Sequence, residues 1–315
     1  MKKLNTGISR RECITGLAAM WAAALAPTRG LGAGDQHPLR LAVSTEMLAG
    51  ANVNDARTAY RIWIREISDF TGTQSAETVP EVFLSSEELI KAVRNDEIDC
   101  YGLVAPELAP ILDVTAPDPI VLQDSLVEGI EYVLLVHNNS TFKKLSDLRG
   151  AQIVSHLHRD MVLLPAWLGT TLASNGLPMP ERFFGSQRQS DKINQVVLPV
   201  FFHRLDAACV SRPNWQTAIE LNPQLGRDLR PLIVSPAVIP TGFFFRKNTK
   251  AESRDALIKS IQATATLAAG RQIMDLYQSG GFAIKTMAAM KPTLEMVRQF
   301  ERLSGLQAGL RKGPA

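Results

Sequence analysis

The chain has 315 residues, of which 45% are hydrophobic, 21% are charged and 6% are aromatic. This length suits one large or two medium-sized domains, and the composition is that of a soluble globular protein, which excludes collagen-like, coiled-coil and disordered chains. The formal net charge of +3 arises within residues 1–33, which hold five basic residues and one acidic residue, so the remainder carries a net charge of −1. A nearly neutral body offers no basic surface for nucleic acid, which excludes that class of partner.

The N-terminus, residues 1–33, has the features of an export signal. The pair Arg10-Arg11 precedes an uncharged run, 14–26, that is rich in alanine and leucine. As a helix this run spans about 20 Å, less than a bilayer core of about 30 Å. The arginine pair is typical of twin-arginine signals, although Cys13 stands where a bulky apolar residue is usual. The alternatives are a general secretory signal and an N-terminal tether; in each case we expect the body of the chain in the periplasm.

The chain then alternates between strand and helix patterns, which predicts parallel α/β architecture. The elements expected in this first unit are a strand at 39–43, a helix that begins at Asn54 or Asp55, a strand at 79–84, a helix opened by the capping-box pair Ser85 and Glu88, and a strand at 98–104. Their order is that of a βαβαβ unit.

A second unit of similar order follows a proline-rich stretch without helical periodicity, at which the chain is expected to cross to another body. The predicted elements are strands at 132–137, 151–155 and 205–211, and helices at 163–174 and 191–200. A return crossing at 235–242 leads to C-terminal helices. The sequence therefore predicts two similar α/β lobes with a cleft between them.

Several segments, in their order and spacing, resemble the phosphate/phosphite/phosphonate-binding periplasmic proteins of ABC importers. They are Glu87-Glu88-Leu89-Ile90-Lys91-Ala92-Val93, the turn Leu145-Ser146-Asp147-Leu148-Arg149-Gly150, Pro165 in the following helix, the strand Leu205-Asp206-Ala207-Ala208, and the hinge-like Ser235-Pro236-Ala237-Val238-Ile239-Pro240. The resemblance covers about residues 38–292.

This resemblance implies the type II periplasmic binding protein fold, an α/β fold with two similar lobes joined by two crossover segments. Lobe 1 would comprise 38–116 and 243–315, and lobe 2 would comprise 125–236, with hinges at about 117–129 and 235–242. In such proteins the lobes close over the ligand by a hinge motion, driven by contacts that both lobes make with it.

The implied function is capture of a small, anionic solute for an ABC importer, by a monomer whose protein partner is the ABC permease. The alternatives are a sensor subunit for a membrane signalling kinase and, further off, an exported metal carrier or enzyme. The sequence lacks a Gly-x-Ser-x-Gly elbow, a phosphate-binding loop and a His-Glu-x-x-His motif. We therefore expect no enzyme activity, no cofactor and no metal.

Departures from the family pattern bear on the ligand. Phosphonate-binding members have a Ser-Thr-Ser-Gly run at the start of the lobe-2 helix, where this chain has His158-Arg159-Asp160-Met161. A family histidine near Asp191-Lys192 is missing, the polar pair after Pro240 is replaced by Thr241-Gly242, and the tyrosine of the "GPxxY" motif has no match. Phosphonate binding therefore does not follow from the resemblance.

Thr45, Glu46, Tyr101 and Ser211 are candidate ligand-binding residues because they lie at the ends of predicted strands, where ligands of open α/β sheets bind. His158, Arg159, Asp160 and Lys192 are further candidates, because they stand where the resemblance places ligand-contacting residues. Arg159 is expected to contact the anion, since its planar guanidinium matches an oxyanion, and Asp160 to cap the lobe-2 helix or orient Arg159. A structural role in a loop is the alternative for each residue. His156, His158 and Asp160 also have the chemistry of metal ligands, which the adjacent Arg159 opposes.

Cys100 and Cys209 are the two cysteines that follow the predicted signal. Both lie in apolar, strand-like stretches, and two isolated cysteines do not make a disulfide framework. We expect two buried thiols that act as small hydrophobic side chains.

Overall fold

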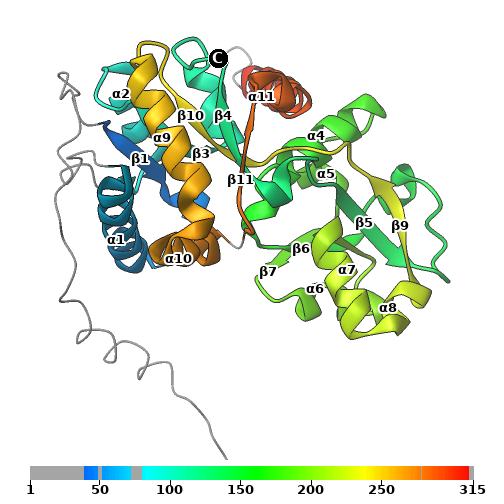
Figure 1. Cartoon of the computed structure of the whole chain (residues 1–315). Helices are drawn as coiled ribbons and strands as arrows, with labels where there is room; N and C mark the ends of the chain where they lie inside the picture. Colours follow the sequence, from blue (N-terminus) through cyan, green and yellow to red (C-terminus); the bar gives the residue numbers. More distant parts are fainter. Residues whose placement is uncertain (1–38, 49–51, 72–79, 278, 312–315) are drawn as a thin grey trace, which may run out of the picture. The chain divides into compact units, whose positions relative to one another are not determined.

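The computed structural model describes residues 39–48, 52–71, 80–277 and 279–311 (Figure 1). The predicted export signal lies outside these residues. Within the described part of the chain, no helix is both long enough and apolar enough to span a membrane.

The first sheet has six strands in the order β11-β4-β10-β3-β1-β2. Its strands are β1 (Leu41–Ser44), β2 (Glu81–Phe83), β3 (Cys100–Val104), β4 (Ile120–Gln123), β10 (Thr241–Phe245) and β11 (Phe282–Lys285). β1 pairs in parallel with β2 and β3, whereas β10 runs antiparallel to β3 and β4. The carboxyl ends of β1, β2 and β3 therefore meet at one edge of this sheet.

Helices cover this sheet, the longer ones being α1 (Val53–Thr71), α2 (Ser86–Arg94), α9 (Ala251–Ala263) and α10 (Ala268–Tyr277). The α1 helix begins earlier than expected because Asn52 caps it, its Oδ1 accepting from the backbone N–H of Asn54 at 2.9 Å. Ser85 caps α2 as predicted, accepting from the N–H of Glu88. Short helical turns are η1 (Thr45–Leu48), α3 (Ala105–Leu108), η2 (Ala109–Ile111), η3 (Asp124–Leu126), η6 (Thr264–Thr266) and η7 (Met287–Met290).

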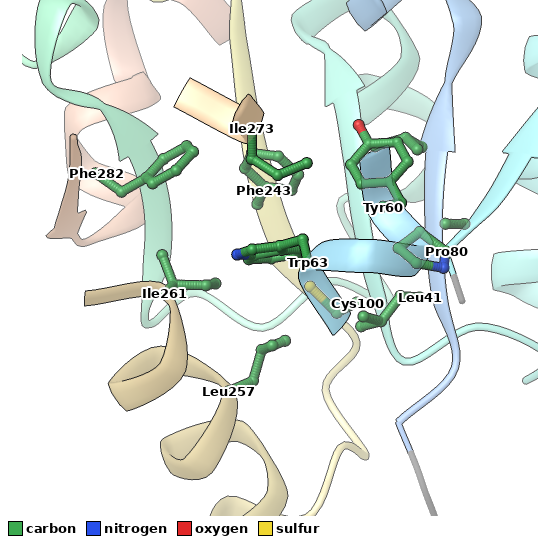
Figure 2. Close-up of a pocket in the computed structure, with 12 residues that line it drawn as sticks. Leu41, Tyr60, Trp63, Pro80, Cys100, Phe243, Leu257, Ile261, Ile273 and Phe282 are labelled. Atoms are coloured by element: carbon green, nitrogen blue, oxygen red, sulfur yellow. The ribbon is translucent and has the colours of Figure 1, made fainter. Parts of the chain in front are cut away.

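A small apolar cavity lies where α1, α9 and α10 pack on the sheet. Figure 2 shows Tyr60 and Trp63 of α1 and Leu257 and Ile261 of α9 around it. Its volume is about 30 Å³, and its lining is almost entirely apolar. An apolar space of this size stays dry, so the cavity is a packing feature of the core and not a site for a solute.

The second sheet has five strands in the order β7-β6-β8-β5-β9. They are β5 (Tyr132–His137), β6 (Gln152–His156), β7 (Ser186–Ser190), β8 (Ala207–Ser211) and β9 (Leu229–Val234). β6 pairs in parallel with β7 and β8, and β5 runs antiparallel to β8 and β9. The accompanying helical segments are η4 (Leu145–Leu148), η5 (Arg159–Met161), α4 (Leu164–Ser174), α5 (Pro180–Phe183), α6 (Ile193–Phe201), α7 (Arg212–Leu221) and α8 (Pro223–Asp228). Each sheet thus has a core of three parallel strands, and the predicted α/β architecture is confirmed.

The first crossing differs from the expected one at 117–129. Residues Ile120–Gln123 form β4, a fully buried strand inside the first sheet. The chain leaves that sheet only after β4 and returns through the segment before β10. These two connections pair with each other, since Ile130 and Val238 exchange backbone hydrogen bonds of 2.8 and 2.9 Å.

The C-terminal helix α11 (Lys291–Arg311) does not belong to the first lobe alone, as the range 243–315 implied. It packs against α3 and also against α4, which follows a strand of the second sheet. Gly169 of α4 makes the approach close, because a Cβ atom there would lie 2.7 Å from the ring of Phe300. Thr293 of α11 also accepts from the backbone N–H of Ile239 at 2.8 Å. The helix therefore ties the second lobe and the return connection together.

Candidate functional site

The carboxyl edge of the first sheet carries the turn η1, which includes two of the candidate residues. β1 ends at Ser44, whose Oγ accepts from the backbone N–H of Glu46 at 3.1 Å and so fixes the turn. Thr45 is half-buried and Glu46 is exposed. The side chain of Glu46 therefore reaches solvent just beyond the end of a buried strand.

Beneath this turn lies a buried carboxylate that the sequence did not reveal, that of Glu107 at the start of α3. The residue is 5% exposed. Its Oε1 accepts from the hydroxyl of Ser44 at 2.8 Å and from the hydroxyl of Ser86, and its Oε2 accepts from the backbone N–H of Val104 at 3.1 Å. A buried carboxylate is stable only with such partners. Glu107 thus joins the end of β1, the first turn of α2 and the end of β3.

The carboxyl edge of the second sheet carries His158, Arg159 and Asp160, directly after β6. These residues were expected to begin the lobe-2 helix, but they form the separate turn η5, and α4 begins only at Leu164. The N–H of Asp160 donates to Nδ1 of His158 at 3.3 Å, and that of Met161 donates to the carbonyl of His158 at 2.9 Å. The N–H groups of Asp160 and Met161 are therefore bonded within the turn, and the expectation that the lobe-2 helix begins at these residues is wrong.

The side chains of the turn form a compact group of charges. Arg159 is largely buried, with 8% of its side chain exposed, and its Nε lies 3.6 Å from Oδ1 of Asp160. Nδ1 of His158 lies 3.3 Å from Oδ2 of the same carboxylate. The phenol of Tyr132, on β5, donates to the carbonyl of Asp160 at 2.6 Å and anchors the turn to the sheet. The carboxylate of Asp160 therefore lies between the side chains of His158 and Arg159.

His156, at the end of β6, packs against this group of charged side chains. Its ring stacks on that of His158, with centroids 5.3 Å apart and planes 10° apart. Nε2 lies 3.3 Å from the carbonyl of Asp191, and Nδ1 lies 3.4 Å from the side-chain amide nitrogen of Asn214. Burial, and secondarily the charge of His158, lowers the pKa of His156. The ring is therefore neutral at neutral pH, donating to Asp191 and accepting from Asn214.

The structure brings two of the candidate groups together. The turn η1, which holds Thr45 and Glu46, packs against the turn η5, which holds Arg159 and Asp160, although more than a hundred residues separate the two turns. β8 also packs against η5. Charged and polar candidate residues from the two sheets therefore belong to turns that are in contact.

The other three candidates take different positions. Tyr101 is fully buried as the second residue of β3, away from its carboxyl end, and its hydroxyl lies 2.7 Å from Oγ1 of Thr115. Ser211 is fully buried as the cap of α7, its Oγ accepting from the N–H of Asn214 at 3.5 Å. Both are structural in this arrangement, which corrects their selection as ligand contacts. Lys192 is exposed at the start of α6.

Metal and thiol chemistry receive no support from the site. Among the described residues, no group of three or more histidine, cysteine, aspartate or glutamate side chains is placed to hold a metal ion. Cys100 and Cys209 are free and buried, as predicted. Burial raises the pKa of both thiols, that of Cys209 to about 12, so neither is a reactive thiolate.

Comparisons with known proteins identify a family and several solved structures that this chain resembles. Residues 47–288 match the family of ABC transporter phosphonate periplasmic substrate-binding proteins. XAC2383 from Xanthomonas citri, bound to ATP, superposes with a TM-score of 0.59 at 14% identity, over 85% of this chain and 99% of its own. PhnD1 from Prochlorococcus marinus, in complex with methylphosphonate, gives 0.53 at 16% identity, over 84% and 99% of the two chains. A binding protein component of an ABC phosphonate transporter from Pseudomonas aeruginosa gives 0.53 at 14% identity, over 85% and 88%.

No curated protein matches the sequence significantly. The structural neighbours establish the type II periplasmic-binding-protein fold, and the sensor and enzyme alternatives receive no support from them. The family consists of substrate-binding proteins that act in the periplasm, with ABC transporters as their partners. The match covers most of the chain: the protein belongs to the periplasmic substrate-binding proteins of ABC phosphonate transporters, and its role is to bind a solute.

Proposed function

We propose that the protein is exported, acts as a monomer, and captures a small organic or inorganic oxyanion between the turns η1 and η5 for delivery to an ABC permease. The observation that carries the proposal is Arg159, a largely buried arginine on a turn that packs against the other lobe's turn. A buried guanidinium is costly unless charged groups and hydrogen bonds compensate it. Asp160 contributes to this compensation at 3.6 Å, and a bound oxyanion would add to it through a bidentate contact with the guanidinium.

The opposite turn gives the proposed site its selectivity. Thr45 offers a hydroxyl donor, and Glu46 offers a carboxylate that repels an anion placed too close to it. A ligand is compatible with both turns if its anionic group contacts Arg159 and the rest of the molecule, which faces η1, is neutral or carries a hydrogen-bond donor. Contacts made by both lobes at once are those that favour the closed state of a hinged binding protein.

Phosphate and phosphonates are expected to be poor ligands of this protein, in spite of its family. A phosphonate dianion needs several donors once water is excluded, and the N–H groups of Asp160 and Met161 are already bonded within η5. The hydroxyl run of the phosphonate-binding members is also missing.

Calorimetric titration with phosphate, 2-aminoethylphosphonate, acetate, succinate, methanesulfonate and sulfate tests the proposal. We expect carboxylates or sulfonates to bind more tightly than either phosphorus compound. A dissociation constant of about 1 µM or lower, equivalent to about −8 kcal/mol, for phosphate or the phosphonate would contradict this expectation. Absence of binding by every anion would contradict anion capture itself.

A further inference from the structure

We propose that an oxyanion binds at the turn η5 together with a proton, which His158 takes up, so that binding strengthens as the pH falls. The inference rests on the proposed function, in that the anion is the one held beside Arg159. The inference gives His158 a role in selectivity, and it restricts the ligand to anions that remain charged in mildly acidic solution.

The geometry around Nδ1 of His158 suits both protonation states. The backbone N–H of Asp160, a donor, lies 3.3 Å from this nitrogen, and Oδ2 of the same residue, an acceptor, also lies at 3.3 Å. When the ring is neutral at Nδ1, it accepts from the N–H. When it is protonated, it donates to the carboxylate. The ring therefore has a hydrogen-bond partner in both protonation states, although the N–H of Asp160 gives up its acceptor when the ring is protonated; Nδ1 of His158 differs from that of His156 in having a carboxylate oxygen within reach.

Charge balance explains why the anion and the proton would bind together. With a neutral His158, the charges of Arg159 and Asp160 cancel within the turn. Protonation of His158 gives the turn a net charge of +1, which attracts an anion. When His158 is neutral, the guanidinium of Arg159 is the group of the turn that attracts the anion. An anion in turn favours the protonated ring, since an opposite charge nearby stabilises the charged form.

His156 is not suited to take up this proton. Both of its nitrogens already have partners of fixed polarity, the carbonyl of Asp191 for Nε2 and the side-chain N–H of Asn214 for Nδ1. Protonation at Nδ1 would set two donors against each other and would require the Asn214 amide to turn over. The buried, neutral ring of His156 instead stacks on the ring of His158 and holds it in position.

The charged groups around His158 come from its own turn and from the segments that neighbour it. Its own turn contributes Arg159 and Asp160. Asp191, after β7, contacts the stacked ring of His156, and Glu46 belongs to η1, which packs against η5. β8, which also packs against the turn, carries no charged side chain. Oδ2 of Asp160 is the acceptor for a proton on Nδ1 of His158, and Arg159 is the neighbouring positive charge. A bound anion beside Arg159 would offset that positive charge.

The test uses methanesulfonate as the probe, because this monoanion keeps its charge between pH 6 and pH 8 whereas phosphate changes its charge in that range. The dissociation constant is measured at pH 6 and pH 8 from the rise in melting temperature with methanesulfonate concentration, against chloride at equal ionic strength. Linkage of one proton allows up to about tenfold per pH unit above the pKa of the ring. We therefore expect binding to be at least about fivefold weaker at pH 8 than at pH 6.

Two variants assign the effect. In His158→Asn the side-chain oxygen can still accept from the N–H of Asp160 but cannot take up a proton, so we expect the ratio between the two pH values to fall to about one. His137→Asn is the matched control, because Nδ1 of His137 accepts from the N–H of Asn139 at 3.1 Å in the same two-residue geometry, on β5 at the opposite edge of the sheet. This control is expected to keep the wild-type ratio.

The outcomes separate the inference from the proposed function. Equal binding of methanesulfonate at both pH values, or a pH dependence that persists in His158→Asn, would overturn the proton uptake and leave anion capture intact. Failure of methanesulfonate to bind at either pH would overturn the inference. If acetate, succinate and sulfate also failed to bind, the proposed function would be overturned as well.

Discussion

Replacing Arg159 with alanine is expected to weaken binding of the anionic ligand by about 2–5 kcal/mol, the range for removing one partner of a buried charged pair. The free energy of unfolding should change by less than about 1 kcal/mol, because Asp160 keeps the N–H and imidazole neighbours of its own turn and is partly exposed. Titration of the wild type and the variant with the best ligand of the anion series measures the first quantity. Chemical denaturation measures the second.

Arg204→Ala is the control for this comparison. The guanidinium of Arg204 lies over the ring of Phe202, just after α6, and the structure gives it no part in η5. Its removal should leave ligand affinity unchanged. If Arg159→Ala bound the ligand as tightly as the wild type, Arg159 would have no place in the site.

Replacing Glu107 with alanine is expected to destabilise the protein by roughly 3–5 kcal/mol, since three donors lose a buried acceptor at once. The donors are the hydroxyls of Ser44 and Ser86 and the N–H of Val104. Loss of the Ser44 contact also frees the turn η1, so ligand affinity should fall in the molecules that remain folded. Thermal and chemical denaturation check the first effect.

Glu87→Ala, a change of an exposed glutamate on α2, serves as the control and should alter stability by no more than about 0.5 kcal/mol. A loss of under 1 kcal/mol in Glu107→Ala would show that the three donors find other partners. The role of Glu107 as the link between β1, α2 and β3 would then be wrong.

The two-lobe architecture was predictable because its parallel strands are short apolar runs that alternate with amphipathic helices. β4 was missed for a related reason. Its four residues, Ile120–Gln123, are all buried and follow two prolines, so they show neither the alternation of a half-exposed strand nor a helical period. The position of α11 was missed because its contact with Gly169 and Phe300 is purely tertiary.

The candidate site could be predicted only as far as the ends of strands. His158, Arg159 and Asp160 were identified because they stand where the phosphonate-binding members have their Ser-Thr-Ser-Gly run. Tyr101 failed because the sequence did not fix the register of β3, in which this residue pairs with Ala42 in the middle of the sheet. Glu107 was overlooked because its partners, Ser44 and Ser86, lie 63 and 21 residues away, and no local pattern marks such a contact.

Native mass spectrometry of the protein, purified from the periplasm without denaturation, tests anion capture most directly. The protein should carry a single small adduct whose released form is an anion. The adduct should be retained in Arg204→Ala and lost in Arg159→Ala. An adduct present equally in wild type and Arg159→Ala, or a released molecule that is a cation or a neutral compound, would contradict capture of an oxyanion at the turn that carries Arg159.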